Sequence, residues 1–262
     1  MKTARLNDLD VHYRDDGPRD GPAVVFANSL GTDLRMWEPI LPFLPEGLRI
    51  VRYDKRGHGL TECPPAPYAM GALVTDAEQL IDHLGLRDVM FVGLSIGGLI
   101  AQGLAVKRPD LIKAMVLSNT AAKIGTMEMW HDRVAAVDTG GIASISEGIL
   151  QRWFSKSFLT SADLPPWRNM VERQPDQGYA GCCAAIAGTD FMATTASLTI
   201  PVLAIAGSED GATPPDLVRE TAELVPGARF ELIRGGGHLP HIEHPKAYAD
   251  LLIGFLTETG HL

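Results

Sequence analysis

A serine flanked by glycines stands in the stretch GLSIG, residues 93–97. The apolar run 89–94 before it predicts a strand, and the run 96–107 after it predicts a helix. A sharp strand-to-helix turn presents a hydroxyl over the strand end, beside the free N–H groups of the helix, which suits a nucleophile. The alternative is a helix-capping serine followed by glycines that serve packing. The strand before the turn favours Ser95 as a nucleophile.

A serine hydroxyl needs a general base and an acidic group that orients the base. His238 follows the loop RGGG after the last apolar run, and Glu209 and Asp210 follow the apolar run 200–207. Nucleophile, acid and base then occur in the order Ser95, Asp210, His238, as expected after a strand–turn–helix nucleophile. We prefer Asp210 to Glu209 because the pattern Asp-x-x-Thr-Pro places it just ahead of a helix start.

Acyl chemistry also needs two backbone N–H groups that stabilise the developing oxyanion. One is expected from Ile96, directly after the nucleophile, and the other from the loop NSLGTD after the apolar run 22–28. Leu30 is the preferred second donor, with Ser29 as the other candidate. The alternative for this loop is a simple turn ahead of a helix.

The spacing His238-x-x-His241-x-x-His244 could suggest a metal site. Pro240 and Pro245 interrupt any regular helix there, so the three rings are not expected to share a face. We therefore predict no metal, and ordinary loop or helix-entry positions for His241 and His244.

These groups require a scaffold that brings strand ends together. Short apolar runs alternate with helical patterns along most of the chain, which predicts an α/β fold with a mostly parallel sheet and helices on both faces. The expected strands are 22–28, 48–54, 88–94, 112–119, 200–207 and 228–233, after an exposed hairpin strand near residue 10, and the expected helices are 33–44, 72–84, 96–107, 214–225 and 244–258. Arg56 and His58 are expected to structure the loop after 48–54.

One segment breaks the alternation. Residues 121–196 contain helical stretches, three of the four tryptophans and no convincing strand. We expect a helical cap inserted into a core formed by residues 1–120 and 197–262, because loops at strand carboxyl ends surround the site in such sheets. The alternative is a helical domain with a purely structural role.

The composition limits the function classes. The formal charge of −9 and the pI near 5.3 argue against a general nucleic-acid or anionic-membrane binder. Neither a signal-peptide core nor a run of about 18 apolar residues is present. The chain has an odd number of cysteines, Cys63, Cys182 and Cys183, and they show no C-x-x-C spacing. We therefore expect reduced thiols in a cytoplasmic protein. The sequence leaves the oligomeric state open.

Taken together, these motifs resemble the α/β-hydrolase superfamily along the whole chain. The stretch YDKRGHGLT, residues 53–61, looks like the family's loop after the fourth strand, and GHLPHIEHP, residues 237–245, is similar to its histidine loop. Most members have His-Gly where this chain has Asn28-Ser29. The stretch NSLGTDLRMW, together with RYDKRGHG and GLSIGGLIAQGLA, is similar to the 3-oxoadipate enol-lactonases.

The resemblance implies hydrolysis of a small carboxylated enol-lactone through an acyl-enzyme, in aromatic catabolism and without a cofactor. The substrate carboxylate would need a cation, for which Arg133 is the candidate, while Trp130 and Trp153 would line the pocket. Each could instead serve the surface or the packing of the cap. Other functions remain open: another serine carboxylesterase, a perhydrolase, a C–C hydrolase, or a ligand-binding protein without turnover.

Overall fold

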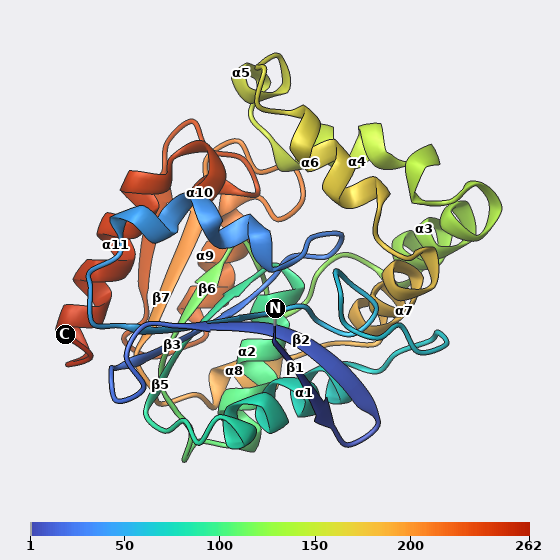
Figure 1. Cartoon of the computed structure of the whole chain (residues 1–262). Coiled ribbons are helices and arrows are strands. Elements are labelled where there is room, and N and C mark those ends of the chain that lie inside the picture. Colours follow the sequence, from blue (N-terminus) through green and yellow to red (C-terminus); the bar gives the residue numbers. More distant parts are fainter. Residues whose placement is uncertain (1) are drawn as a thin grey trace.

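The computed structural model describes residues 2–262, and its centre is one eight-stranded sheet (Figure 1). The strand order is β1-β2-β4-β3-β5-β6-β7-β8, with antiparallel pairs β1–β2 and β2–β4 and parallel pairs elsewhere. The predicted mostly parallel sheet is confirmed. The strands are β1 (Lys2–Leu6), β2 (Leu9–Asp16), β3 (Ala23–Ala27), β4 (Arg49–Tyr53), β5 (Val89–Leu94), β6 (Ile112–Ser118), β7 (Val202–Gly207) and β8 (Arg229–Ile233).

Every residue of β3, β5 and β7 is buried, because helices cover both faces of the sheet. Figure 1 shows η1 and α11 on one side of the sheet and α1 and α2 on the other. The covering helices are η1 (Leu34–Phe43), α1 (Met70–His83), α2 (Ile96–Lys107), α9 (Pro215–Glu223), α10 (Pro240–Glu243) and α11 (Pro245–Glu258).

Two elements differ from the sequence-based expectation. The helical pattern at 33–44 forms a 3-10 helix, η1, which contains Pro39 and Pro42. Proline lacks the backbone N–H and its ring clashes with the carbonyl four residues earlier, so these positions interrupt a regular α-helix, and short 3-10 turns form instead. The edge strand β1 was not predicted; it is a short strand with a half-exposed pattern that pairs with β2.

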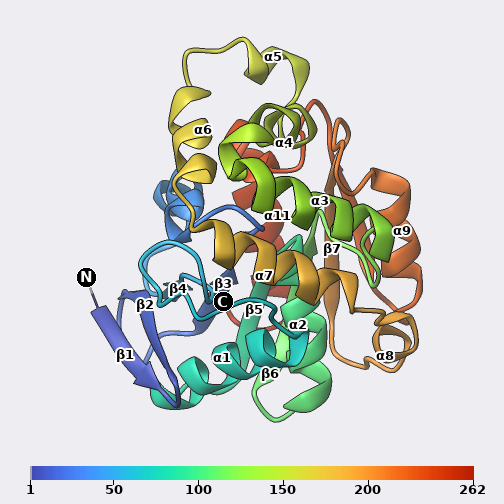
Figure 2. The ribbon, with the colours of Figure 1, turned by 90° about the vertical axis from the view of Figure 1, so that its right-hand side faces the viewer.

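Between β6 and β7 the chain is helical. The elements are α3 (Met127–Gly140), η2 (Ile142–Ser144), α4 (Ser146–Trp153), α5 (Lys156–Leu159), α6 (Pro165–Glu172), α7 (Asp176–Ala187) and α8 (Met192–Ala196). Figure 2 shows α3 and α7 side by side, with α4, α5 and α6 forming the outermost part of the molecule. The last of these helices, α8, lies against α2, where Thr195 donates a hydrogen bond to Gln102.

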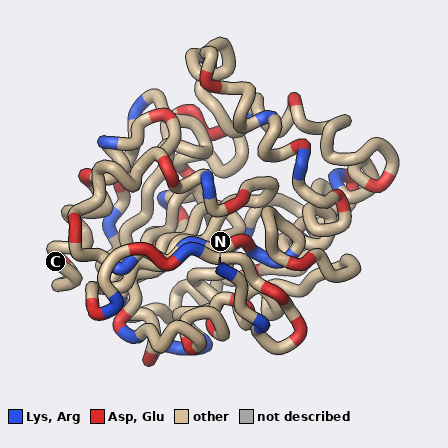
Figure 3. The backbone as a smooth tube through the Cα atoms, viewed as in Figure 1, with Lys and Arg blue, Asp and Glu red and all other residues tan. Residues whose placement is uncertain are grey.

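Charged positions are distributed over the whole fold. Figure 3 shows Lys and Arg interspersed with Asp and Glu along the backbone, so the net charge of −9 is not gathered on one face. Within residues 2–262, no helix is both long enough and apolar enough to cross a bilayer.

Candidate active site

The turn between β5 and α2 holds Ser95 in an unusual backbone conformation. Its φ is 59° and its ψ is −120°, a region that residues with a side chain seldom occupy. Hydrogen bonds fix the turn: the Ser95 amide donates to the Ser118 carbonyl at 3.0 Å, and the Ser95 carbonyl accepts from the Thr120 hydroxyl at 2.6 Å. The surrounding structure therefore imposes the conformation that presents the Ser95 side chain.

The glycines on either side are required by space. A Cβ on Gly93 would lie 2.2 Å from the Gly97 carbonyl oxygen, and a Cβ on Gly97 would lie 2.2 Å from the Ala27 carbonyl oxygen. Both contacts are with backbone, which cannot move aside without shifting β3 or α2. The sharp turn and the close approach of three elements account for the pattern G-x-S-x-G.

His238 and Asp210 meet at the carboxyl ends of β8 and β7. The His238 Nδ1 atom lies 2.9 Å from Asp210 Oδ2, and both side chains are buried. Asp210 also accepts hydrogen bonds from the side-chain amide of Asn119 at 2.8 Å and from the Thr213 hydroxyl at 2.8 Å. Glu209 lies elsewhere, where it accepts from the Lys156 amide. The structure thus brings Asp210, and not Glu209, against the histidine.

Opposing influences set the pKa of Asp210. Burial raises it, but the positive charge of protonated His238 and the hydrogen bonds from His238, Asn119 and Thr213 outweigh burial. The net result is a pKa below the usual aspartate value. Asp210 therefore stays ionised at neutral pH and can orient the Nδ1–H of His238, which leaves Nε2 as the free nitrogen.

A cavity of about 230 Å³ opens at this edge of the sheet, between the strand ends and the helices after β6. Ser95 and His238 both line it. The predicted residues that also line it are Leu30, its alternative Ser29, Trp130, Arg133 and Trp153. The cavity is also lined by residues that were not predicted, among them Met129, Arg152, Tyr179 and Leu217. Ile96 begins α2, so its amide is one of the free N–H groups at that helix start.

Two arginines face this cavity without a carboxylate partner. Neither Arg133 nor Arg152 forms an ion pair with any of residues 2–262, and the Arg133 guanidinium lies 4.9 Å from the Trp130 ring centre. Burial lowers the pKa of Arg152, and the like charge of Arg133 lowers it further. Two unneutralised cations in a small cavity would attract an anionic ligand.

The segment after α4 connects the helical insertion to the loops of Asp210 and His238. The His238 amide donates to the Trp153 carbonyl at 2.7 Å, and the Gly211 amide donates to the Arg152 carbonyl at 3.1 Å. The position of α4 therefore depends directly on the loops that carry the base and the acid.

The loop after β3 is held by hydrogen bonds to Tyr53, Trp37 and His58. The Asn28 side-chain Nδ2 donates to the Tyr53 carbonyl at 2.7 Å, and Asn28 Oδ1 accepts from the Trp37 indole at 2.8 Å. The Gly31 amide donates to His58 Nε2 at 3.0 Å. Burial, and then the charge of Lys55, hold the pKa of His58 well below its usual value, which matches a neutral ring that accepts at Nε2. Asn28 is thus a hydrogen-bonded anchor of this loop.

The three histidines of the 238–244 stretch have separate surroundings. His238 contacts Asp210, while the ring of His241 packs at a tilt against Trp37 with centres 4.5 Å apart, and His244 precedes α11. Among residues 2–262, no group of three or more His, Cys, Asp or Glu is arranged to hold a metal ion.

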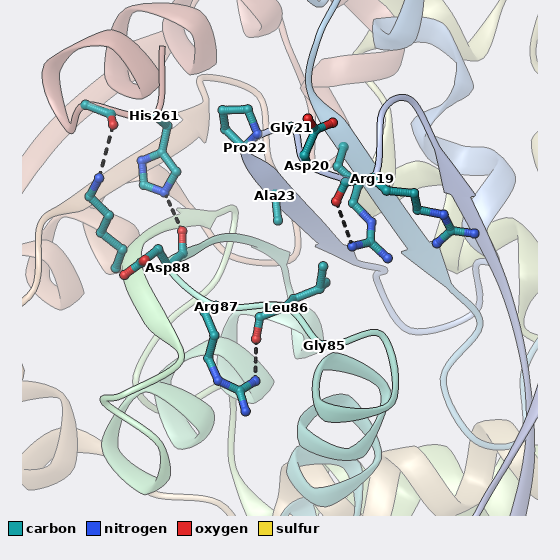
Figure 4. Close-up of a pocket in the computed structure, with 13 residues that line it drawn as sticks. Arg19, Asp20, Gly21, Pro22, Ala23, Gly85, Leu86, Arg87, Asp88 and His261 are labelled. Carbon is teal, nitrogen blue, oxygen red and sulfur yellow. Dashed lines mark hydrogen bonds between the residues drawn. The ribbon is translucent and has the colours of Figure 1, made fainter.

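A second cavity, of about 350 Å³, lies at the opposite end of the sheet (Figure 4). It is lined by residues that precede β3 and β5, such as Pro22 and Asp88, whereas Ser95 follows β5. Its polar groups bond one another: His261 Nε2 lies 2.9 Å from the Asp88 carbonyl oxygen, and Lys113 donates to the Gly260 carbonyl at 3.1 Å. This cavity contains neither the serine nor its base.

Sequence reasoning missed several residues of the site. Asn119 could have been noticed as a polar residue at the carboxyl end of an apolar run, and Thr213 is the threonine of the Asp-x-x-Thr-Pro pattern. Arg152 and Tyr179 carried no signal, because each lies in a helical stretch whose orientation depends on tertiary packing.

Comparison with known proteins places this geometry in a family. Residues 22–245 match the alpha/beta hydrolase fold family. A 3-oxoadipate enol-lactonase of Acinetobacter baylyi is 35% identical over 243 residues, covering 92% of this chain and 91% of the relative. A second enol-lactonase of that organism is 33% identical, with 94% and 92% covered. The crystal structure of the enol-lactonase from Burkholderia xenovorans LB400 superposes with a TM-score of 0.94 at 36% identity, covering 98% of this chain and 100% of that chain.

Proposed function

The chain belongs to the α/β-hydrolase fold family and is an ester or lactone hydrolase, and from this premise we propose that it opens a small carboxylated enol-lactone. The proposed reaction converts 3-oxoadipate enol-lactone to 3-oxoadipate in aromatic catabolism. The observation that carries the proposal is the single cavity lined by Ser95, His238 and two unpaired arginines. The names of the similar enol-lactonases support the same substrate class.

In the first half of the reaction, Ser95 Oγ attacks the lactone carbonyl while His238 Nε2 takes the hydroxyl proton. The amides of Leu30 and Ile96 donate to the oxyanion. The ring C–O bond then breaks, and the departing enol oxygen takes the proton from His238. Asp210 keeps the imidazole oriented and stabilises its protonated form.

In the second half, water attacks the acyl-enzyme and gives a proton to His238 Nε2. The Ser95–acyl bond breaks, the serine oxygen regains the proton, and the product leaves as a carboxylate. The enol generated by ring opening becomes the ketone. Apart from the attacking water, the catalytic groups that these steps use come from the chain, so the proposal needs neither a cofactor nor a metal.

The carboxylate of the substrate lies between Arg133 and Arg152. Paired guanidinium groups bind carboxylates through charge-assisted hydrogen bonds, and a cavity that excludes water strengthens them. The helices of residues 121–196 act as the cap that supplies both arginines and the apolar wall. The proposed setting is the cytoplasm, with a small molecule as the partner.

A substrate panel tests the proposal. We expect kcat/KM for the enol-lactone to exceed that for p-nitrophenyl acetate and for a ring-cleavage dienoate by orders of magnitude. In Arg152→Gln, KM for the enol-lactone should rise about 10-fold or more, since a charge-assisted bond is lost, while p-nitrophenyl acetate hydrolysis stays within about 3-fold.

The matched control is Arg168→Gln. Arg168 pairs with Glu147 at 2.6 Å on the outer surface of the same helical segment, so its loss should leave both substrates unaffected. A wild-type preference for the dienoate or for the neutral ester would contradict the enol-lactone assignment. An equal effect of Arg152→Gln on all substrates would contradict the role of Arg152.

A further inference from the structure

Lys55 is a buried cation that the reaction described above does not use. Its side chain follows β4 and is 2% exposed. The ammonium donates to the Ser29 carbonyl at 2.6 Å and to the Thr32 carbonyl at 3.1 Å, and within residues 2–262 it forms no ion pair. Burial lowers the pKa of Lys55 to about 8. A buried ammonium without a carboxylate costs free energy, so its position behind this loop needs a reason.

The reason lies in the peptide that Lys55 contacts. The Ser29 carbonyl and the Leu30 amide belong to the same peptide unit, and in a trans peptide the C=O and the N–H point in opposite directions. Lys55 holds the oxygen side. Ser29 and Leu30 line the cavity of Ser95, and the Leu30 amide has no acceptor among residues 2–262.

We infer that Lys55 is a positioning residue that turns the Ser29–Leu30 peptide toward the cavity and strengthens the Leu30 amide as an oxyanion donor. This inference rests on the proposed function, because it needs an oxyanion to form at Ser95. A cation on a carbonyl oxygen draws electron density through the peptide and makes the N–H a better donor, and the effect is large where water is excluded.

Neutral hydrogen bonds hold the conformation of the loop of Ser29 and Leu30, so the charge of Lys55 can be tested apart from that conformation. The Thr32 hydroxyl also donates to the Ser29 carbonyl, at 2.8 Å, and the Gly31 amide donates to His58 Nε2 at 3.0 Å. These neutral bonds hold the loop without Lys55. What Lys55 adds is the positive charge on one particular peptide, so a neutral substitute should keep the fold of the loop and weaken its donor.

The experiment compares wild type with Lys55→Met on p-nitrophenyl acetate, a substrate that does not depend on the identity of the natural one. We expect kcat to fall about 10-fold to 100-fold, somewhat less than for complete loss of an oxyanion donor, with KM within about 3-fold. Phenylboronic acid, which forms an anionic tetrahedral adduct with serine, should bind more weakly by a similar factor. Adipate, which forms no oxyanion, should bind equally well.

A spectroscopic measurement reports on the amide itself. In the boronate adduct, the proton resonance of the Leu30 amide should lie further downfield in wild type than in Lys55→Met. Should Lys55→Met not fold, Lys55→Gln replaces it. That variant keeps a neutral donor, and its kcat should also fall below wild type, because the charge is lost.

The control is Arg49→Met, which removes a buried cation at the other end of the sheet, where Arg49 pairs with Asp15 at 3.0 Å. It should lower stability and leave kcat unchanged. Unchanged kcat and an unchanged Leu30 resonance in the Lys55 variants would overturn the inference but not the proposed function. A parallel loss of boronate and adipate binding would do so as well. Wild-type protein that neither reacts with a fluorophosphonate nor hydrolyses any ester would overturn the proposed function and this inference together.

Discussion

Ser95, His238 and Asp210 differ in how firmly their surroundings fix them. Asp210 accepts from a histidine, an amide and a hydroxyl, and its backbone neighbours add further donors. Ser95 is fixed through its backbone, with φ at 59°. His238 lies between them: Asp210 orients its ring, and Ser95 is the group whose proton it takes. Each residue alone has little chemistry, and the arrangement gives the group its reactivity.

Replacing the nucleophile should separate chemistry from folding. In Ser95→Ala, kcat should fall by about 10⁴-fold or more, because no other hydroxyl is held at the turn. Labelling by a fluorophosphonate, read by intact mass, should disappear, while the circular dichroism spectrum stays that of wild type. Ser197→Ala, at an exposed serine after α8, is the control and should label fully. Residual turnover near the wild-type level in Ser95→Ala would assign the nucleophile elsewhere.

At the scale of elements, β3, β5 and α2 approach so closely that Gly93 and Gly97 have no room for a Cβ. The same tightness joins the helical insertion to the core, where the end of α4 accepts hydrogen bonds from the amides of Gly211 and His238. A shift of α4 would therefore displace the loops of the acid and the base. The site depends on these junctions as much as on its own side chains.

A pair of glycine substitutions tests this dependence. Gly97→Ala would place a Cβ 2.2 Å from the Ala27 carbonyl oxygen, so we expect a loss of about 2 kcal/mol or more in the free energy of unfolding, together with loss of labelling. Gly254→Ala, in α11, meets no atom within 4 Å and should stabilise the protein by about 0.5–1 kcal/mol. Urea denaturation measures both. Equal stability of the two variants would show that α2 does not approach β3 tightly at Gly97.

At the scale of the whole molecule, buried neutral histidines link stability to pH. Burial lowers the pKa of His241 to about 3, and burial followed by the charge of Lys55 lowers the pKa of His58 well below its usual value. In the unfolded chain these rings bind protons below about pH 6.5, whereas in the folded protein they do not. Stability is therefore present above that pH and decreases as the pH falls toward the folded-state pKa.

His241→Phe should reduce this acid sensitivity. Phenylalanine keeps the contact with Trp37 and cannot take up a proton. We expect the difference in the free energy of unfolding between pH 7.5 and pH 5 to shrink by about 2 kcal/mol. A buried neutral histidine costs roughly 1.4 kcal/mol of stability for each pH unit below about pH 6.5, and this cost disappears in the variant. Urea denaturation at the two pH values measures it, and His131→Gln, at an exposed position, is the control. An undiminished difference in His241→Phe would mean that His241 is protonated in the folded protein.

Except for β1, the order of the strands and the polar groups at their ends could be predicted from the sequence. Apolar runs fix strands, glycines mark the turn at Ser95, and polar residues after such runs must gather at one edge of a parallel sheet. These patterns are local, so they could be read without coordinates. The choice of Asp210 over Glu209 also rested on a local pattern, the approach to a helix start.

Which side chains face the cavity, and which distant segments touch, depends on tertiary packing. Arg152 and Tyr179 enter the cavity because α4 and α7 pack in one particular orientation, which no periodicity within either helix specifies. Lys55 meets the Ser29–Leu30 peptide because β3 and β4 are neighbours in the sheet, although 26 positions separate Lys55 from Ser29. Contacts of this kind depend on the packing of distant segments, and a local pattern in the chain carries no record of them.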